Sequence, residues 1–289
     1  MPQIPFQSYF LGCPQWKHLA WREHVFTTQT RVQDLLLAYA QLFNTVEGNT
    51  TFYATPQKEI LKKWSEDVES NFRFIFKLHQ EITHDCLLQG AALDLTLHWI
   101  EHFEVIHKNM GPVMIQLPAR FTPSYINTLY TYLQKLPSTL NYSVELRHPE
   151  WTQEPYLSEV NQLLAACKVE RIWMDTLALR QAQAPLDDKT QQAWDRKPNL
   201  PVYPIALGPH PMIRYVANPD LSANQSRLHL LAEQVAQWIR EGRKPYFFAH
   251  YPGEYYAPDI AEMFHTILSQ YIEIAPRPKW PSQQQLTLF

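Results

Sequence analysis

Short apolar runs alternate with longer amphipathic segments along nearly the whole chain, and this alternation restricts the fold more than any other feature. The runs are typical of buried strands, and the segments between them carry apolar residues at helical spacing. We expect strands at 8–11, 43–47, 72–77, 113–117, 142–146, 171–175, 213–216 and 246–249. We expect helices at 31–42, from residue 56, and at 85–107, 123–136, 154–166, 226–240 and 258–271. Repeated strand–helix units predict an α/β protein with a TIM-like (β/α)8 barrel.

The alternation is interrupted once and stops near the end of the chain. The segment at about 176–211 holds glutamines and prolines without a strand pattern, and it predicts an insertion over the barrel mouth. We expect a single domain at 1–275, followed by a Pro-rich tail at 276–289. With 289 residues, of which 45% are hydrophobic, the chain can bury a large core.

Composition argues against several classes of protein. The net charge is −3 and no long block of like charge occurs, so attraction of the whole molecule to nucleic acid or membrane is not expected. The 3 cysteines are far apart, which disfavours disulfides or a thiolate zinc site and favours the cytoplasm. No signal peptide is expected, because the first residues have no basic region followed by an apolar run. No membrane-spanning helix is expected, because no apolar run of about 18 residues occurs.

Four sequence words stand in a defined order. They are F-N-T-V-E-G-N-T-T-F-Y at Phe43–Tyr53, F-R-F-I-F-K with I-T-H at Phe72–Lys77 and Ile82–His84, G-P-V-M-I-Q-L-P at Gly111–Pro118, and V-E-L-R-H-P-E-W at Val144–Trp151. In order and spacing they resemble the YecE-like family, also called domain of unknown function 72, over roughly residues 8–270. The resemblance implies a TIM-like barrel and no particular reaction. Family words of the type R-L-H-G and F-N-N are replaced here at Ile213–Asn218 and Phe247–Gly253.

Polar and aromatic residues stand where the expected strands end, which is where barrel proteins carry their functional groups. They are Trp16, Arg22, Glu47, Asn49, Tyr53, Lys77, His84, Gln116, Arg120, Glu145, Arg147, His148, Trp151, Asp175, Arg214 and His250. Because side chains alternate along a strand, Glu145 and Arg147 face the same way. Glu47, Lys77 and Asp175 are expected to join them at the mouth.

These residues predict a site for an anion. Lys77 and Arg147 would bind phosphate, and Arg147 could do so with two hydrogen bonds. The acid or base candidates are Glu47, Glu145, His148 and Asp175. The other ligand-binding candidates are Asn49, Tyr53, His84, Gln116, Trp151, Trp16 and Arg22. Two alternatives are open: the charges pair into a plug that fixes the strand register, and the aromatic rings pack instead of stacking on a ligand.

The chain lacks G-x-S-x-G, P-loop and G-x-G-x-x-G motifs, which argues against a serine hydrolase, a P-loop NTPase and a Rossmann protein. No cofactor is expected. A divalent metal is an alternative, because nitrogen and oxygen ligands are available on Glu47, His84, Glu145, His148, Asp175 and His250. The expected function is recognition of phosphate or nucleic acid, with phosphodiester hydrolysis as the reaction. The alternatives are a sugar or sugar-phosphate isomerase or lyase, and a binding module without chemistry.

The chain ends in Q-L-T-L-F, which is similar to the peptide Q-L-[S/D]-L-F that binds the bacterial DNA sliding clamp. Gln285 would form hydrogen bonds at the edge of a pocket, and Leu286, Leu288 and Phe289 would enter it. The similarity to the clamp-binding peptide predicts that the tail recruits the protein to DNA. The alternative is that the same apolar residues dock on the protein's own surface.

Overall fold

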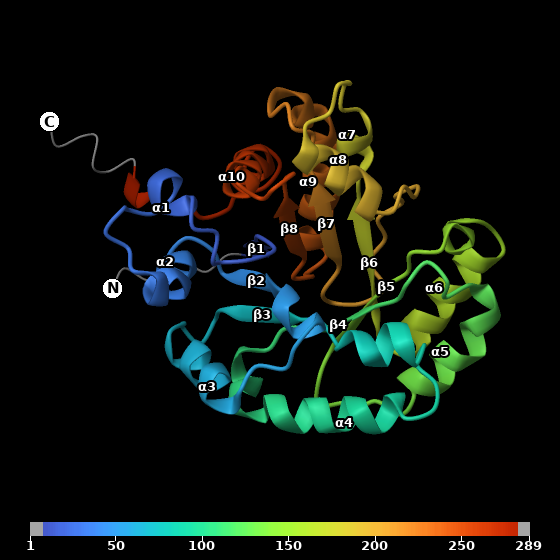
Figure 1. Ribbon diagram of the computed structural model, residues 1–289. Coiled ribbons are helices and arrows are strands. Elements are labelled where there is room, and N and C mark those ends of the chain that lie inside the picture. The colour runs from blue at the N-terminus through green and yellow to red at the C-terminus, as the bar shows by residue number, and fades with distance from the viewer. Residues whose placement is uncertain (1–7, 283–289) are drawn as a thin grey trace, which may run out of the picture.

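Eight strands occur in the computed structural model, which describes residues 8–282 (Figure 1). Each overlaps one of the expected strands. They are β1 (Phe10–Gly12), β2 (Thr45–Gly48), β3 (Arg73–Phe76), β4 (Val113–Gln116), β5 (Tyr142–Glu145), β6 (Glu170–Asp175), β7 (Met212–Val216) and β8 (Tyr246–His250). The strand prediction is therefore confirmed, with boundaries that differ by one or two residues.

All strand pairs are parallel, as expected when each strand is followed by a helix. One sheet has the order β1-β8-β7-β6-β5-β4, and a second sheet pairs β2 with β3. The α/β class is confirmed. The ladders contain a curled sheet of six strands and a separate pair, and the expected closed ring of eight strands is not contained in them.

Helices lie around the outside of the strands, with α3 and α4 below them and α5 and α6 at the lower right in Figure 1. The α-helices are α1 (Trp21–His24), α2 (Leu35–Ala40), α3 (Lys58–Glu66), α4 (Ala92–His102), α5 (Ile126–Leu133), α6 (Tyr156–Ala166), α7 (Leu177–Arg180), α8 (Asp188–Arg196), α9 (Gln225–Arg240) and α10 (Ala257–Leu268). The 3-10 and π-helical segments are η1 (Val32–Asp34), η2 (Asn49–Phe52), η3 (Glu81–Asp85), η4 (Phe103–Asn109), η5 (Pro123–Tyr125), η6 (Pro149–Thr152) and η7 (Ser222–Asn224). Within residues 8–282, no helix combines the length and the apolar character that a membrane span requires.

The long helix expected from residue 85 begins later than the sequence pattern suggested. Asp85 ends the π-helical turn η3 instead of capping α4. Leu87 and Leu88 then adopt positive φ angles of 50° and 62°, and Gly90 has a φ of 55°. Because left-handed residues cannot continue a right-handed helix, α4 starts only at Ala92.

The buried apolar residues of the described chain form three clusters, of which the smallest holds Met174, Leu179 and Val216. The largest one fills the space between the strands and the surrounding helices. A smaller inner layer lies between the strands themselves, and its members are Ile75, Met114, Ile172, Met212, Tyr246 and Phe248. Five strands therefore turn apolar side chains toward one another, as in the interior of a barrel.

The insertion between β6 and β7 carries α7 and α8. Asp187 caps α8, because its carboxylate accepts hydrogen bonds from the backbone N–H groups of Lys189 and Thr190 at 2.9 Å each. This is the usual role of Asp at a helix start. The cap fixes the first turn of a helix that the sequence pattern had not indicated.

Candidate functional site

Polar side chains continue the inner layer at the carboxyl ends of the strands. A residue two positions after an inner apolar residue faces the same side of its strand. Ile75, Met114, Met212 and Phe248 are followed in this way by Lys77, Gln116, Arg214 and His250. Glu47 lies in the last half of β2, Glu145 ends β5 and Arg147 follows it. We call these seven residues the strand-end cluster.

Arg214 holds the centre of the strand-end cluster. Its Nε and Nη2 donate to the two carboxylate oxygens of Glu47 at 2.8 and 2.7 Å. Its Nη1 donates to Oε2 of Glu145. All three side chains are at most 2% exposed. One guanidinium thus neutralises two buried carboxylates that come from different strands, and the forked geometry of arginine suits this task.

The remaining members surround this centre. Lys77 Nζ lies 3.0 Å from Glu47 Oε1 and donates to Gln116 Oε1 at 3.1 Å. Arg147 donates from Nε to Glu145 at 2.6 Å and from Nη2 to Gln116 at 2.9 Å. His250 Nε2 lies 3.1 Å from Glu47 Oε2. The cluster is therefore a continuous network in which each carboxylate has at least two cationic or imidazole partners.

This network shifts the ionisation of its members. Burial alone would raise the pKa of both glutamates, but the facing cations outweigh it. Arg214, Lys77 and His250 hold the pKa of Glu47 well below its usual range. Arg214, Arg147 and Lys77 lower the pKa of Glu145 to about 2. Burial and the nearby Arg214 lower the pKa of Lys77 to about 7. The carboxylates stay charged, while the lysine is close to losing its proton at neutral pH.

A cavity of about 340 Å³ opens above the strand-end cluster. We call it the strand-end cavity. The cations that line it are Lys77, Arg147, Lys189, Arg196, Lys197 and Arg214, and the one acidic residue of the lining is Glu254. Asn49, Tyr53 and His250 also line it. Residues of α8 and residues at the strand ends thus line the same cavity, and this lining carries more positive than negative charge.

Three of these cations come from the insertion and form no direct ion pair in the described part of the chain, although Asp187 attracts Lys189 and Glu254 and Glu47 attract Lys197 from a longer distance. The side chains of Lys189, Arg196 and Lys197 make no hydrogen bond or ion pair with any of residues 8–282. Lys197 lines the same cavity as Arg214, and burial together with Arg214 lowers the pKa of Lys197 although Glu254 and Glu47 oppose this shift. The carboxylates of the strand-end cluster already have partners, so these additional cations are available to bind an anionic ligand.

The structure brings five of the predicted residues into direct contact, namely Glu47, Lys77, Gln116, Glu145 and Arg147. Asn49 and Tyr53 line the cavity beside them. Asn49 also donates to the carbonyl oxygen of Pro14 at 2.8 Å. Tyr53 is 69% exposed, so its ring stands at the entrance.

Asp175 does not join the cluster, and this corrects the expectation that it faces the mouth. Its carboxylate pairs with Arg227 of α9 at 2.6 Å and accepts the N–H of Leu177 at 3.0 Å. Burial raises the pKa of Asp175 despite these contacts. The inner position of β6 belongs to Ile172, and the next residue on that face is Met174, so alternation turns Asp175 outward.

Three other candidates have structural contacts. His148 accepts the N–H of Glu150 at 3.3 Å and caps η6, and it does not line the cavity. Trp151 is fully buried and donates to the carbonyl oxygen of Phe121 at 2.7 Å. Trp16 packs edge-on against Trp64 with ring centroids 5.0 Å apart. Neither tryptophan presents a face on which a ligand in the strand-end cavity could stack.

Arg22 and His84 are not among the residues that line the strand-end cavity. Arg22 donates to the backbone of Thr28 at the surface. His84 packs against Phe52, and burial together with Arg147 lowers its pKa to about 4. The tail residues Gln285, Leu286, Leu288 and Phe289 lie outside the described residues.

The side chains proposed as metal ligands do not converge. Glu47 and His250 are in contact, whereas Asp175, His84 and His148 each have other partners. In the chain from 8 to 282, no group of three His, Cys, Asp or Glu side chains is arranged to hold a metal ion.

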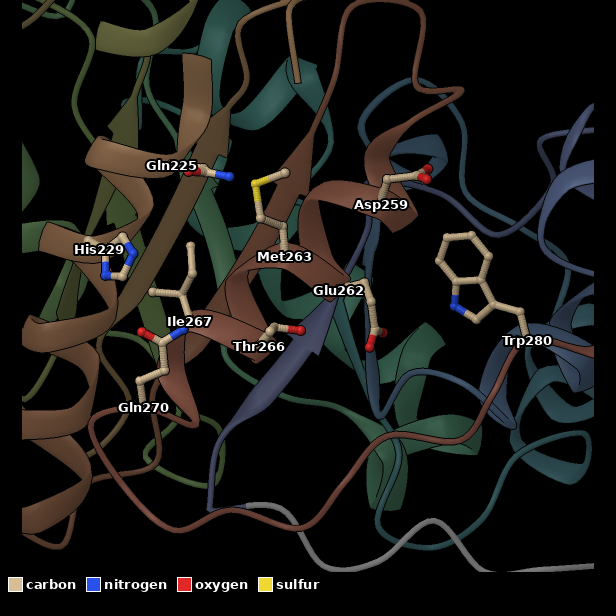
Figure 2. Close-up of a pocket in the computed structure, with 9 residues that line it drawn as sticks. All are labelled: Gln225, His229, Asp259, Glu262, Met263, Thr266, Ile267, Gln270 and Trp280. Carbon is tan, nitrogen blue, oxygen red and sulfur yellow. The ribbon is translucent and has the colours of Figure 1, made fainter. Parts of the chain in front are cut away.

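A second cavity, of about 460 Å³, lies between α9 and α10 (Figure 2). It is lined by Gln225, His229, Asp259, Glu262, Met263, Thr266, Ile267, Gln270 and Trp280. Two carboxylates and no lysine or arginine face it, so it does not suit an anion. The lining of the strand-end cavity is positively charged and that of the second cavity is negatively charged, so the strand-end cavity is the candidate site for an anion.

Sequence reasoning listed Arg214 and His250 as strand-end residues but assigned them no role in ligand binding. The signal for Arg214 was a single charged residue inside the apolar run Met212–Val216. The insertion residues Lys189, Arg196 and Lys197 were missed. Their spacing at the two ends of α8 puts them over the mouth only once the insertion has folded.

A sequence profile and two solved structures, each named for the same family, match this chain, as does a curated sequence relative. A sequence profile described as "Protein of unknown function DUF72" matches residues 10–285. UPF0759 protein YecE of Escherichia coli (strain K12) is 31% identical over 279 residues, which cover 96% of this chain and 99% of the relative. A solved DUF72 family protein from Thermotoga maritima MSB8 superposes with a TM-score of 0.66 at 18% identity, covering 90% of this chain and 99% of the other. One from Enterococcus faecalis V583 gives 0.65 at 16% identity, with 93% and 99% covered.

Proposed function

This chain belongs to the DUF72 family, and we propose that its strand-end cavity binds a small phosphorylated compound. The unpaired cations of the insertion carry the proposal. The two carboxylates of Glu47 and Glu145 are already neutralised by the guanidiniums of Arg214 and Arg147, and no direct ion pair within residues 8–282 offsets the charges of Lys189, Arg196 and Lys197. A salt-bridged plug accounts for the strand-end cluster and leaves these three residues unexplained.

The size of the strand-end cavity favours a small ligand over a nucleic-acid strand. Its volume of about 340 Å³ is at the lower end of small-molecule sites, which occupy about 300–1,000 Å³. The net charge of −3 opposes an extended contact with a polyanion. A sugar phosphate or a mononucleotide fits both observations, and the isomerase or lyase class fits better than a phosphodiester hydrolase acting on long chains.

Titration calorimetry of the whole protein with ribose 5-phosphate, and separately with ribose, tests this proposal. Phosphate should increase affinity strongly, and Arg147→Ala and Lys197→Ala should each weaken binding about tenfold, because a charged hydrogen bond contributes about 1.5–3 kcal/mol. Arg31→Ala is the matched control, since Arg31 pairs only with Asp34 at the surface. Equal affinity for ribose and ribose 5-phosphate would refute a phosphate site.

We also propose that the two sheets form one TIM-like ring of eight strands. The N–H of Glu47 donates to the carbonyl oxygen of Cys13 at 3.1 Å, which links the end of β2 to the end of β1. The N–H of Leu78 donates to Met114 at 3.0 Å and links β3 to β4. Hydrogen exchange tests the ring: the Glu47 and Leu78 amides should be as protected as those of β7. Rapid exchange at either amide would indicate an open sheet.

A separate proposal concerns the tail at 283–289, which we expect to bind a DNA sliding clamp. The chain is anchored immediately before it, because Ser282 donates to the carbonyl oxygen of His24 at 2.7 Å and Trp280 packs edge-on against the His24 ring. Deleting 286–289 should abolish binding to a purified clamp in surface plasmon resonance and leave the unfolding temperature unchanged. A lower unfolding temperature with unchanged clamp binding would indicate that the tail docks on this protein instead.

A further inference from the structure

We propose that Lys77 is a nucleophile, whose amine condenses with the carbonyl carbon of a phosphorylated aldehyde or ketone to form an imine. This inference rests on the proposed function, because the phosphate group would hold the carbonyl compound in the strand-end cavity. Beyond phosphate binding, the inference names a reacting atom, Lys77 Nζ, and a class of substrate, phosphorylated aldehydes and ketones. Imine formation weakens bonds next to the former carbonyl carbon, which is the chemistry that isomerases and lyases need.

The position of Lys77 suits this role. It follows directly after β3, lines the strand-end cavity and is only 5% exposed. Its Nζ is held from two sides, by Glu47 Oε1 at 3.0 Å and by Gln116 Oε1 at 3.1 Å. A side chain with four rotatable bonds is thus fixed with its amine at the cavity, in contact with a carboxylate that stabilises positive charge on the nitrogen.

The surroundings of Lys77 also favour the neutral amine that a nucleophile requires. The charged groups that face it come from three strands, namely Glu47 of β2, Glu145 of β5 with Arg147 after it, and Arg214 of β7. Burial and the two guanidiniums oppose the ammonium, and the two carboxylates favour it. The net result is a pKa of about 7, against 10.5 for an ordinary lysine. A lysine beside other cations and out of water is a known way to activate an amine.

The proposed step is balanced without a co-reactant. The lone pair of Lys77 Nζ attacks the carbonyl carbon, and one N–H proton moves to the former carbonyl oxygen through solvent to give a neutral carbinolamine. The C–O bond then breaks, the hydroxyl group leaves as water with the second N–H proton, and the imine remains. Solvent protonates the imine to a cationic iminium. The Glu47 carboxylate lies next to this nitrogen and stabilises its charge. Lys197 and Arg147 are placed to hold the phosphate of the same molecule.

Reductive trapping tests the inference with the full chain. The protein is incubated with glycolaldehyde phosphate and sodium cyanoborohydride, which delivers hydride to the imine and makes the bond permanent. Intact mass and peptide mapping should show one adduct per chain, at Lys77, suppressed by excess inorganic phosphate. Adducts spread over surface lysines with Lys77 unmodified would overturn the inference.

Two comparisons sharpen the result. Labelling at Lys77 should rise with pH and level off above about pH 7, whereas surface lysines should continue to gain reactivity toward about pH 10. Lys77→Arg keeps the cation without the primary amine and should lose the adduct, while Lys62→Arg, at an exposed position of α3, should keep it. Mapping on the unaltered protein remains decisive if Lys77→Arg does not fold. A Lys77 rate that rises in parallel with the surface lysines would contradict the activated amine.

The experiment also separates this inference from the proposed function. Ribose 5-phosphate binding without any adduct at Lys77 would remove the nucleophile and leave the phosphate site. Equal trapping of glycolaldehyde and glycolaldehyde phosphate at Lys77 would remove the phosphate site and support the reactive amine.

Discussion

Replacing Arg214 with methionine should destabilise the fold more than any other change in the strand-end cluster. Methionine has similar length and no charge, so the change isolates the loss of the guanidinium. Removing one partner of a buried ion pair costs about 3–5 kcal/mol, because the other charge stays buried. Glu47 keeps Lys77 and His250, and Glu145 keeps Arg147, so we expect about 3 kcal/mol at pH 7, the lower end of that range.

The pH dependence of this loss gives the stricter test. Glu145 has a pKa of about 2 in the fold against an ordinary 4.5, and this difference corresponds to about 3 kcal/mol. A depressed carboxylate pKa stabilises the fold above pH 4.5, and that contribution disappears as the pH falls toward 2. Arg214→Met should lack most of this contribution. The difference in unfolding free energy between the two proteins should therefore shrink as the pH falls from 4.5 to 2.

Urea unfolding followed by circular dichroism at a series of pH values measures the difference. Arg31→Met is the control, because Arg31 forms an exposed pair with Asp34 and should show no measurable change. A loss below about 1 kcal/mol at pH 7, or a difference that stays constant down to pH 3, would refute the buried network as described.

Three further changes test other parts of the structure. Gly12→Ala should lower the free energy of unfolding by about 2 kcal/mol or more, measured in urea, because a Cβ there would lie 2.1 Å from the carbonyl oxygen of Thr45. Asp187→Ala should fray α8 and weaken ribose 5-phosphate binding in calorimetry, whereas Asp188→Ala, next to the cap, should not. Trp151→Phe should cost about 1–2 kcal/mol in urea through the loss of its buried hydrogen bond and leave ligand affinity unchanged, and altered affinity would contradict a purely structural Trp151.

The strands were predictable because their apolar runs are short, separate and flanked by turn residues. The alternation of side chains also placed Glu145 and Arg147 on one face, and their 2.6 Å contact agrees with it. The start of α4 was not predictable in this way. Asp85 is a good capping residue, but the left-handed turn at Leu87 and Leu88 depends on packing that residue types do not encode.

The sequence predicted most of the strand-end cluster but not the residues that the insertion adds to the cavity lining. Residues at strand ends converge because parallel strands all end on one side, a rule that needs only the strand order. Asp175 obeys the same rule and still faces outward, because the face of a strand is set by register and a shift of one residue reverses it. Lys197 belongs to a segment without strand periodicity. It faces the same cavity as Lys77 only because the insertion folds there.

A crystal structure of the protein with saturating ribose 5-phosphate tests the central claim most directly. The account predicts a phosphate group in the strand-end cavity, within hydrogen-bond distance of Arg147 and Lys197, while the Arg214 bonds to Glu47 and Glu145 remain in place. A cavity without the sugar phosphate, or a phosphate bound only at another surface, would contradict it.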